Sequence, residues 1–235
     1  MSNESTVVIT GAAGALGRAV TAAFLSRKAR LVLIDRERKL LEQAFPQLAS
    51  DSRHLLLAAD VTSESSMAQT AKEIFAKMGR VHSLVHVAGG FTMGESVFTL
   101  SRETWDQMMN LNAWSFIVTA KPFVAPMKAA GGGSIVAITA RAALSGAAQM
   151  SAYCASKSAL QRLVESLSAE VREDGIRVNS VAPSVIDTPA NRAAMPGADA
   201  SRWVPTEHLA ETIAFLTSDA AASIHGQHLI IAARS

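Results

Sequence analysis

Residues 7–17 read Val7-Val8-Ile9-Thr10-Gly11-Ala12-Ala13-Gly14-Ala15-Leu16-Gly17. The short β-branched run at the start predicts a buried strand, and the glycines that follow predict a tight turn. Helical spacing of apolar residues begins directly after the turn, over residues 15–28. Glycines at such a junction let the backbone approach a pyrophosphate, and the helix amino terminus offers it unpaired N–H groups. A glycine-rich turn without a ligand is the alternative, but the strand-turn-helix context favours a dinucleotide site.

The same alternation of strand and helix continues along the chain. Apolar segments predict further strands at residues 31–34, 54–58, 81–87, 134–139, 176–181 and 228–231, and helical periodicity predicts helices at residues 37–48, 63–78, 101–129, 151–173 and 206–217. Strands that are apolar along their whole length are covered by helices on both faces, as in parallel sheets with right-handed crossovers. The pattern therefore predicts an α/β fold of the Rossmann type, with about seven strands in a doubly wound parallel sheet.

Composition restricts the class of protein. Hydrophobic residues make up 49% of the chain and charged residues 18%, a balance typical of a compact folded domain. The net charge of +2 is small and no block of like charges occurs, so nucleic acid is not expected as a partner. Cys154 is the only cysteine, so we expect neither an intrachain disulfide nor a metal site. From the polar residues 1–6 and the absence of a long uncharged apolar stretch we expect neither export nor membrane spanning, and a cytoplasmic location fits best.

Two acidic residues follow predicted strands on the side of the glycine turn. Asp35 lies 18 positions after Gly17, close to the offset at which a carboxylate reaches an adenosine ribose. A carboxylate there repels a 2'-phosphate, so NAD is preferred over NADP as the expected cofactor, although the neighbouring Arg36 could turn toward a phosphate. Asp60 is a candidate contact to the adenine edge, and capping the helix that starts near Ser63 is the alternative.

Tyr153 and Lys157 are candidates for chemistry. They are four residues apart, so on a helix they share one face. An ammonium near a phenol favours the phenolate, so we expect a lowered pKa for Tyr153. Such a phenol can exchange a proton with a substrate while a hydride passes to or from nicotinamide. The pair could also be incidental on an amphipathic helix, but Tyr153 is the only tyrosine of the chain.

Several motifs together resemble the short-chain dehydrogenase/reductase family over nearly the whole chain. They are the turn at residues 10–17, Asp60-Val61, Ala88-Gly89, Asn112, Tyr153-Cys154-Ala155-Ser156-Lys157 and residues 183–188. The resemblance implies a single NAD(P)-binding Rossmann domain over residues 1–235 with oxidoreductase activity. It also implies a homodimer or homotetramer, which the long apolar helices at residues 101–129 and 151–173 favour independently.

The resemblance also assigns residues. Tyr153 would be the general acid/base, Lys157 its tuner and a ribose ligand, and Asn112 part of a proton relay through water. Thr188 and the backbone near Ile186 would hold the nicotinamide carboxamide. The full set of implied cofactor contacts is Gly11, Gly14, Ala15, Leu16, Gly17, Asp35, Asp60, Val61, Ala88, Gly89, Tyr153, Lys157, Pro183, Ile186 and Thr188. Residues 188–205, with Met195-Pro196-Gly197 among them, are expected as an irregular insert over the small-molecule substrate.

Three departures from the family pattern stand out. Ala15 replaces the usual middle glycine, and His86-Val87-Ala88-Gly89 stands where Asn-Asn-Ala-Gly is common. Ala140 lies 13 residues before Tyr153, where the family has its substrate-orienting serine. Thr139 or Ser145 could supply a displaced hydroxyl, but strand alternation should point Thr139 to the opposite face, so loss of the serine is the simpler interpretation.

Within the family, these departures resemble quinoid dihydropteridine reductase-like members. The resemblance includes Ala140 together with Asp187-Thr188-Pro189, Asn191-Arg192 and Met195-Pro196. A quinonoid dihydropterin is already strongly electrophilic, so a carbonyl clamp would be less necessary. A carbonyl or 3-oxoacyl reductase is the alternative enzyme, and a cofactor-sensing protein without turnover is the alternative of another class.

Overall fold

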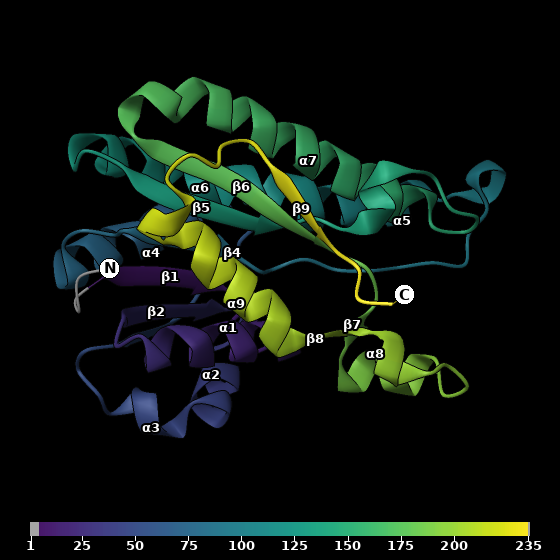
Figure 1. Ribbon diagram of the computed structural model, residues 1–235, viewed down its shortest axis with the longest axis horizontal. Coiled ribbons are helices and arrows are strands. Elements are labelled where there is room, and N and C mark those ends of the chain that lie inside the picture. Colours follow the sequence, from purple (N-terminus) through teal and green to yellow (C-terminus); the bar gives the residue numbers. More distant parts are fainter. Residues whose placement is uncertain (1–4, 235) are drawn as a thin grey trace.

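A parallel sheet of seven strands forms the centre of the molecule in the computed structural model, which describes residues 5–234 (Figure 1). The strands lie in the order β3-β2-β1-β4-β5-β6-β9, and each pairs in parallel with its neighbours. Their bounds are β1 Thr6–Thr10, β2 Arg30–Asp35, β3 Leu55–Ala58, β4 Ser83–His86, β5 Gly133–Ile138, β6 Ile176–Pro183 and β9 His228–Ile231. The predicted Rossmann-type sheet is therefore confirmed.

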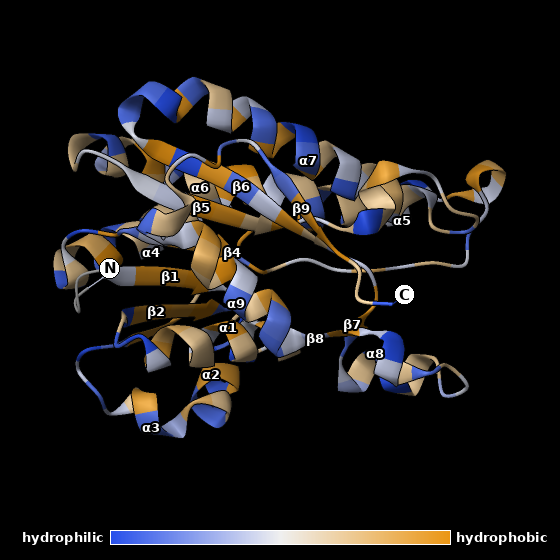
Figure 2. Cartoon of the chain, viewed as in Figure 1, coloured by the Kyte–Doolittle hydropathy of each residue, from blue (hydrophilic) through white to orange (hydrophobic). Residues whose placement is uncertain are grey.

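Helices cover both faces of this sheet (Figure 1). One layer contains α1 Ala15–Ser26, α2 Arg38–Ala44, α3 Pro46–Ala49 and α9 Thr206–Thr217, and the other contains α4 Glu64–Met78, α6 Ser115–Ala129 and α7 Ser151–Val171. Alternate residues of one strand enter the two cores: Val7 and Ile9 pack toward α1, and Val8 packs toward α4 and α6. Figure 2 shows β1 and β2 coloured as hydrophobic along most of their length, as burial on both faces requires.

Two predicted helices are interrupted. Residues 37–48 form α2 and α3 rather than one helix, because Pro46 takes the first position of α3 and disfavours helical backbone at Phe45. Residues 101–129 form α5 Arg102–Met109, a π-helical turn Asn110–Trp114 and α6. π-helical turns occur often at functional sites, and this one contains the candidate Asn112.

The segment at residues 188–205, expected as irregular, has regular structure toward both of its ends. Helix α8 Pro189–Ala194 begins after Thr188, whose Oγ accepts a hydrogen bond from the Asn191 N–H at 3.1 Å, and Pro189 occupies the first helical position. Strands β7 Ile186–Asp187 and β8 Val204–Pro205 pair with each other as a second small sheet. The expectation of an irregular segment is therefore wrong for residues 189–194, because a capping threonine and a proline start a helix there, whereas residues 195–199, with Met195-Pro196-Gly197 among them, belong to no helix or strand.

The parallel order brings the carboxyl ends of the strands to one edge of the sheet. Thr10, Asp35, His86 and Ile138 end β1, β2, β4 and β5, respectively. Strands β2 and β3 are added on one side of β1, and β4, β5, β6 and β9 are added on the other side. Open α/β sheets bind ligands at this point, between β1 and β4, where the strand order reverses. Within residues 5–234, no helix combines the length and apolarity needed to cross a membrane.

Candidate active site

The glycine turn lies between β1 and α1, and two of its glycines are required by the packing of the backbone. Gly11 has a φ of 64°, and a Cβ added there would lie 2.8 Å from the backbone nitrogen of Ala88. A Cβ on Gly17 would overlap the carbonyl oxygen of Gly11. Gly14 and Ala15 are exposed at the start of α1, where no side chain caps the helix. The first-turn N–H groups of α1 therefore remain available to an anion.

Asp35 is fixed beside this turn. Its Oδ2 accepts a hydrogen bond from the Ala13 N–H at 2.9 Å, and its Oδ1 accepts one from the Arg36 N–H at 2.9 Å. The structure thus brings the predicted ribose ligand to the predicted pyrophosphate turn. The Arg36 side chain is 80% exposed, and its Nε lies 3.8 Å from the Glu37 carboxylate.

Asp60 and Val61 follow β3, the strand next to the one that Asp35 ends. Asp60 Oδ1 accepts hydrogen bonds from the backbone N–H and the hydroxyl of Thr62, at 2.8 and 2.6 Å. The cap of α4 is Ser63, whose Oγ accepts from the Ser66 N–H at 3.3 Å. The alternative that Asp60 caps this helix is therefore wrong, because the serine three residues later does so.

Tyr153 and Lys157 lie in the first turns of α7, at the carboxyl end of β5. The Lys157 Nζ donates a hydrogen bond to the Ile138 carbonyl oxygen at 2.8 Å and is buried. The Phe91 ring packs edge-on against the Tyr153 ring, with their centroids 4.9 Å apart. Tyr153 is thus held between its own helix and the loop that follows β4.

Burial determines the pKa values of this pair. Desolvation, with a smaller contribution from the neighbouring Cys154, raises the pKa of Tyr153 to about 12. Desolvation also lowers the pKa of Lys157 to about 8. The lowered phenol pKa expected from the sequence is therefore wrong for this structure, because the loss of water around the buried phenol dominates its pKa.

Asn112 is completely buried in the π-helical turn and faces the same place. Its Oδ1 accepts from the Gly90 N–H at 2.9 Å, and its Nδ2 donates to the Gly90 carbonyl at 3.0 Å and to the Ser156 Oγ at 3.0 Å. A Cβ on Gly89 would lie 2.9 Å from Asn112 Oδ1 and 3.2 Å from Lys157 Nζ. The glycine therefore leaves open the space between the amide and the ammonium.

Neither hydroxyl that could replace the missing serine at Ala140 faces Tyr153. The Thr139 Oγ donates to the Val181 carbonyl at 3.2 Å and lies 3.1 Å from the Ser180 Oγ, so it faces the neighbouring strand β6. Ser145 is exposed and lines a surface hollow beside Cys154 and Ala155. Ala140 itself is 4% exposed and carries no hydrogen-bonding side chain.

The remaining candidates surround the start of α8. Pro183 ends β6 and is buried. The Ile186 carbonyl accepts from the Asn191 Nδ2 at 2.8 Å, while the Thr188 hydroxyl caps the helix. The hydroxyl of Thr188 keeps its own hydrogen to donate, and the segment reaches the carboxyl edge of the sheet where the other candidates lie.

The comparison with protein families agrees with this geometry. Residues 5–198 match the family described as short chain dehydrogenase. The chain belongs to the short-chain dehydrogenase family. It is accordingly an oxidoreductase, and its family uses NAD or NADP as the cofactor.

Relatives of this short-chain dehydrogenase act on different compounds. D-threitol dehydrogenase of Mycolicibacterium smegmatis is 32% identical over 234 residues, which cover 95% of this chain and 90% of the relative. NADPH-dependent pterin aldehyde reductase of Arabidopsis thaliana is 33% identical over 183 residues, covering 78% and 75%. The structure of L-sorbose reductase from Gluconobacter frateurii with NADPH and L-sorbose superposes with a TM-score of 0.88 at 26% identity, covering 97% and 95%.

The site residues of this short-chain dehydrogenase fit a nicotinamide dinucleotide. The turn presents free N–H groups for the pyrophosphate, Asp35 has lone pairs beside the turn for ribose hydroxyls, and the glycine at position 89 leaves room next to Lys157. The Lys157 ammonium has one hydrogen bond, to the Ile138 carbonyl, so two of its three hydrogens remain for ribose oxygens.

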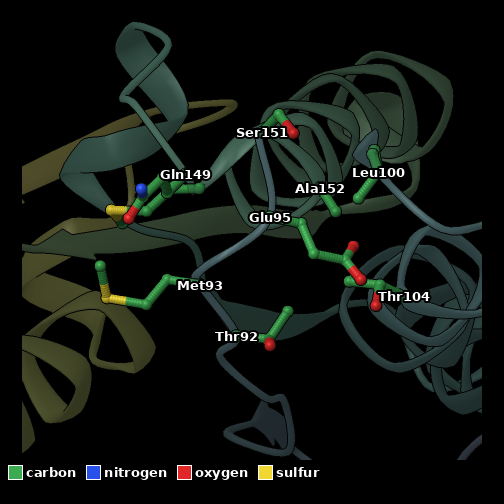
Figure 3. A pocket seen from close by; sticks show the side chains of 9 residues that line it. Thr92, Met93, Glu95, Leu100, Thr104, Gln149, Ser151 and Ala152 are labelled. Carbon is green, nitrogen blue, oxygen red and sulfur yellow. The ribbon is translucent and has the colours of Figure 1, made fainter. Parts of the chain in front are cut away.

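The sequence did not indicate the cavity beside the start of α7, the helix that carries Tyr153. A small cavity of about 20 Å³, room for one water molecule, lies between the loop after β4 and the start of α7 (Figure 3). Its lining includes Thr92, Met93, Glu95, Thr104, Gln149 and Ser151. The Gly94 N–H donates to the Gln149 carbonyl at 2.9 Å and joins the two loops. An aromatic residue, Phe91, directly follows Gly89-Gly90 and was the one sequence feature that could have indicated this part of the site. Its contact with Tyr153, however, depends on the fold.

Proposed function

We propose that this chain catalyses the NAD(H)-linked interconversion of a small secondary alcohol and its ketone. The observation that carries the proposal is the placement of Tyr153, with Lys157 one turn further along α7 and Asn112 and Gly89 facing the same space. The first relative, a polyol dehydrogenase by name, supports this class of reaction.

In the proposed reaction, Tyr153 donates its phenolic proton to the carbonyl oxygen during reduction and accepts it during oxidation. Bound nicotinamide would supply or accept the hydride. Lys157 stabilises the phenolate that remains after proton donation, which is why its buried charge is useful despite the desolvation that lowers its pKa. Asn112, held by Gly90 and Ser156, orients a water molecule that returns the proton to Tyr153.

Cofactor binding in the proposal uses the residues that the resemblance assigns. The turn with Gly11, Gly14 and Gly17 holds the pyrophosphate, and Asp35 accepts hydrogen bonds from the adenosine ribose. A carboxylate at this position favours NADH over NADPH. Residues 188–205 with Thr188 cover the nicotinamide end and the substrate.

A second candidate is reduction of a quinonoid dihydropterin, favoured by Ala140. Ala140 has no hydroxyl that could donate a hydrogen bond to a substrate carbonyl. Such a site suits a substrate that is electrophilic enough to be reduced without this hydrogen bond. The half-exposed ring of Phe91, in contact with Tyr153, offers an apolar surface to a flat ring. The relative from Arabidopsis thaliana, a pterin aldehyde reductase by name, supports a ligand of this kind.

Absorbance at the NADH band, followed with each cofactor and a panel of substrates, tests both candidates. The panel contains quinonoid dihydropterin, cyclic ketones, dihydroxyacetone and an acetoacetyl thioester, with Tyr153→Phe as the control. Turnover of ketones that depends on Tyr153 supports the first candidate, and turnover of the pterin alone supports the second. Binding of NADH without consumption of cofactor by any of them would favour the cofactor-sensing alternative.

We also propose that the chain works as a homodimer or homotetramer. Exposed aromatic side chains stand on the helices that the sequence suggested for contacts, with Trp105 36% and Trp114 42% exposed. The edge strand β9 exposes Ile230 at 50%. Sedimentation that shows a monomer at micromolar concentration would contradict this assembly.

A further inference from the structure

His86 ends β4 and is buried between two parts of the candidate site. It is 1% exposed. Its Nδ1 lies 3.0 Å from the Thr10 Oγ, and its Nε2 lies 3.1 Å from the Ser115 Oγ. Thr10 begins the glycine turn, and Ser115 directly follows the π-helical turn that contains Asn112. One imidazole ring therefore spans the distance from the cofactor turn to the helix of the relay residue.

The neighbouring hydrogen bonds determine the direction of both contacts. The Ser115 hydroxyl uses its single hydrogen to donate to the Leu111 carbonyl at 2.6 Å, so toward His86 it acts as acceptor. The His86 Nε2 must then carry the proton. The Nδ1 is left as an acceptor and receives the Thr10 hydroxyl hydrogen, while the Thr10 Oγ accepts from the Ala88 N–H at 3.4 Å.

The hydrogen bonds of Ser115 also account for the π-helical turn. The Ser115 N–H donates to the Asn110 carbonyl, five residues back, and so does not take the Leu111 carbonyl, four residues back. The Ser115 hydroxyl donates to that carbonyl instead. His86, which lies outside this helix, then fixes the position of the Ser115 hydroxyl and with it the backbone around Asn112.

A neutral ring is required for this arrangement, because only the neutral form has one donor and one acceptor. Complete burial, with a smaller contribution from the Lys157 charge, lowers the pKa of His86 to about 3. The edge of the Phe116 ring packs against the imidazole at a centroid distance of 6.0 Å and completes the apolar surroundings. The hydrogen bonds from His86 to Thr10 and Ser115 should therefore not change with pH over the range in which the protein would be assayed.

We infer that His86 is a positioning residue: as the Nε2–H tautomer it joins the cofactor turn at Thr10 to the π-helical turn of Asn112 and fixes their relative placement. The inference rests on the proposed function in one respect, that the turn binds a dinucleotide. His86 is buried, its two ring nitrogens face Thr10 and Ser115, and it acts through these two residues.

Three variants test this role. His86→Phe keeps a ring of similar volume but has no hydrogen-bonding atoms, whereas the amide of His86→Gln can present both a donor and an acceptor. His82→Phe is the matched control, because the His82 Nδ1 accepts from the Thr6 N–H at 2.9 Å and thus links the same two strand regions at the opposite end of β1. NADH binding is measured by fluorescence titration, and turnover is measured separately on the assembled, full-length chain.

His86→Phe should raise the Kd for NADH and lower kcat, each by about ten- to a hundredfold, as expected when two buried hydroxyls lose their partner. His86→Gln should recover most of both losses, and His82→Phe should change neither by more than about threefold. Nitrogen-15 spectra of the unmodified chain should show His86 protonated on Nε2 and unchanged from pH 8 to pH 5. The amide resonances of Thr10 and Asn112 should shift together in His86→Phe but not in His82→Phe.

Two results would overturn the inference: a proton on Nδ1 of His86, or a His86→Phe variant that binds NADH, turns over and retains the Thr10 and Asn112 resonances like the unmodified chain. A failure of the proposed function looks different. In that case the unmodified chain binds or consumes no NADH, while the tautomer and the paired shifts of Thr10 and Asn112 still decide whether His86 joins the two turns.

Discussion

The side chain of Asp35 holds the backbone of Ala13, through a hydrogen bond of 2.9 Å from the Ala13 N–H to Oδ2. The contact joins the end of β2 to the glycine turn after β1. A carboxylate that is fixed in this way has two functions in the proposed site. It shapes the turn through its oxygen atoms, and it selects among cofactors through its charge.

Replacing Asp35 by asparagine separates these two functions. Asp35→Asn keeps an oxygen for the Ala13 N–H but removes the negative charge, so the turn should persist while repulsion of a 2'-phosphate disappears. The unmodified chain should bind NADH at least about tenfold more tightly than NADPH, and Asp35→Asn should narrow that ratio to about threefold or less. Fluorescence titration with both cofactors measures the ratio of the two dissociation constants. Asp51→Asn, at a partly exposed aspartate paired with Arg53, is the charge-matched control. Equal affinity of the unmodified chain for both cofactors would contradict the preference for NADH.

The buried ammonium of Lys157 should make stability depend on pH. Its pKa of about 8 lies below the ordinary lysine value of 10.5, so between these two pH values the unfolded chain holds a proton that the folded chain has released. Stability from this group therefore rises with pH across that window. Below pH 8 the full cost of the buried charge, about 3 kcal/mol, is present.

Lys157→Met should consequently stabilise the cofactor-free chain at pH 7, and its advantage should decline as the pH rises from 8 to 10.5. Urea denaturation at pH 7, 8.5 and 10 measures the difference in the free energy of unfolding. Lys77→Met, at an exposed lysine paired with Glu73, should show no such trend. A Lys157→Met variant that is less stable than the unmodified chain at pH 7 would show that the burial cost is offset by the hydrogen bond to Ile138.

The parts of the site that the sequence predicts are those set by local geometry. Gly11 and Gly17 lie in one turn, and Tyr153 and Lys157 lie one helical turn apart, so spacing alone places each pair together. Parallel strands then bring the ends of different strands to one edge, so the sequence alone places Asp35 near the turn.

The parts that could not be predicted depend on long-range packing. His86 meets Thr10 across 76 positions of sequence, and nothing near either residue indicates that the ring spans two hydroxyls. The contact of Phe91 with Tyr153 has the same origin. Spacing also cannot give the degree of burial, which is why the expected lowering of the Tyr153 pKa had the wrong sign.

Ala140 should limit which substrates the chain reduces. Ala140→Ser adds a hydroxyl at the end of β5, where it can donate to developing negative charge on a carbonyl oxygen. If the natural substrate is a ketone held without a clamp, kcat/KM for plain ketones should rise about ten- to a hundredfold. Activity on a quinonoid dihydropterin should change little. Ser145→Ala, which removes an exposed hydroxyl outside the site, is the control. A chain that already reduces simple ketones well and gains nothing from the serine would show that another group orients the carbonyl.

Tyr153→Phe tests the chemistry directly, because it removes one oxygen and keeps the ring. The ring packs against Phe91, and no group on the cofactor side depends on the phenol for its position, since Lys157 is held by the Ile138 carbonyl. NADH binding should therefore stay within about threefold of the unmodified value. Loss of general acid catalysis should lower kcat by about 10²- to 10⁴-fold, with a much smaller change in KM.

Stopped-flow measurement of a single turnover separates the chemical step from cofactor release. If the single-turnover rate is unchanged in Tyr153→Phe while NADH is still oxidised, the proton comes from another group and the assignment of Tyr153 as general acid is wrong.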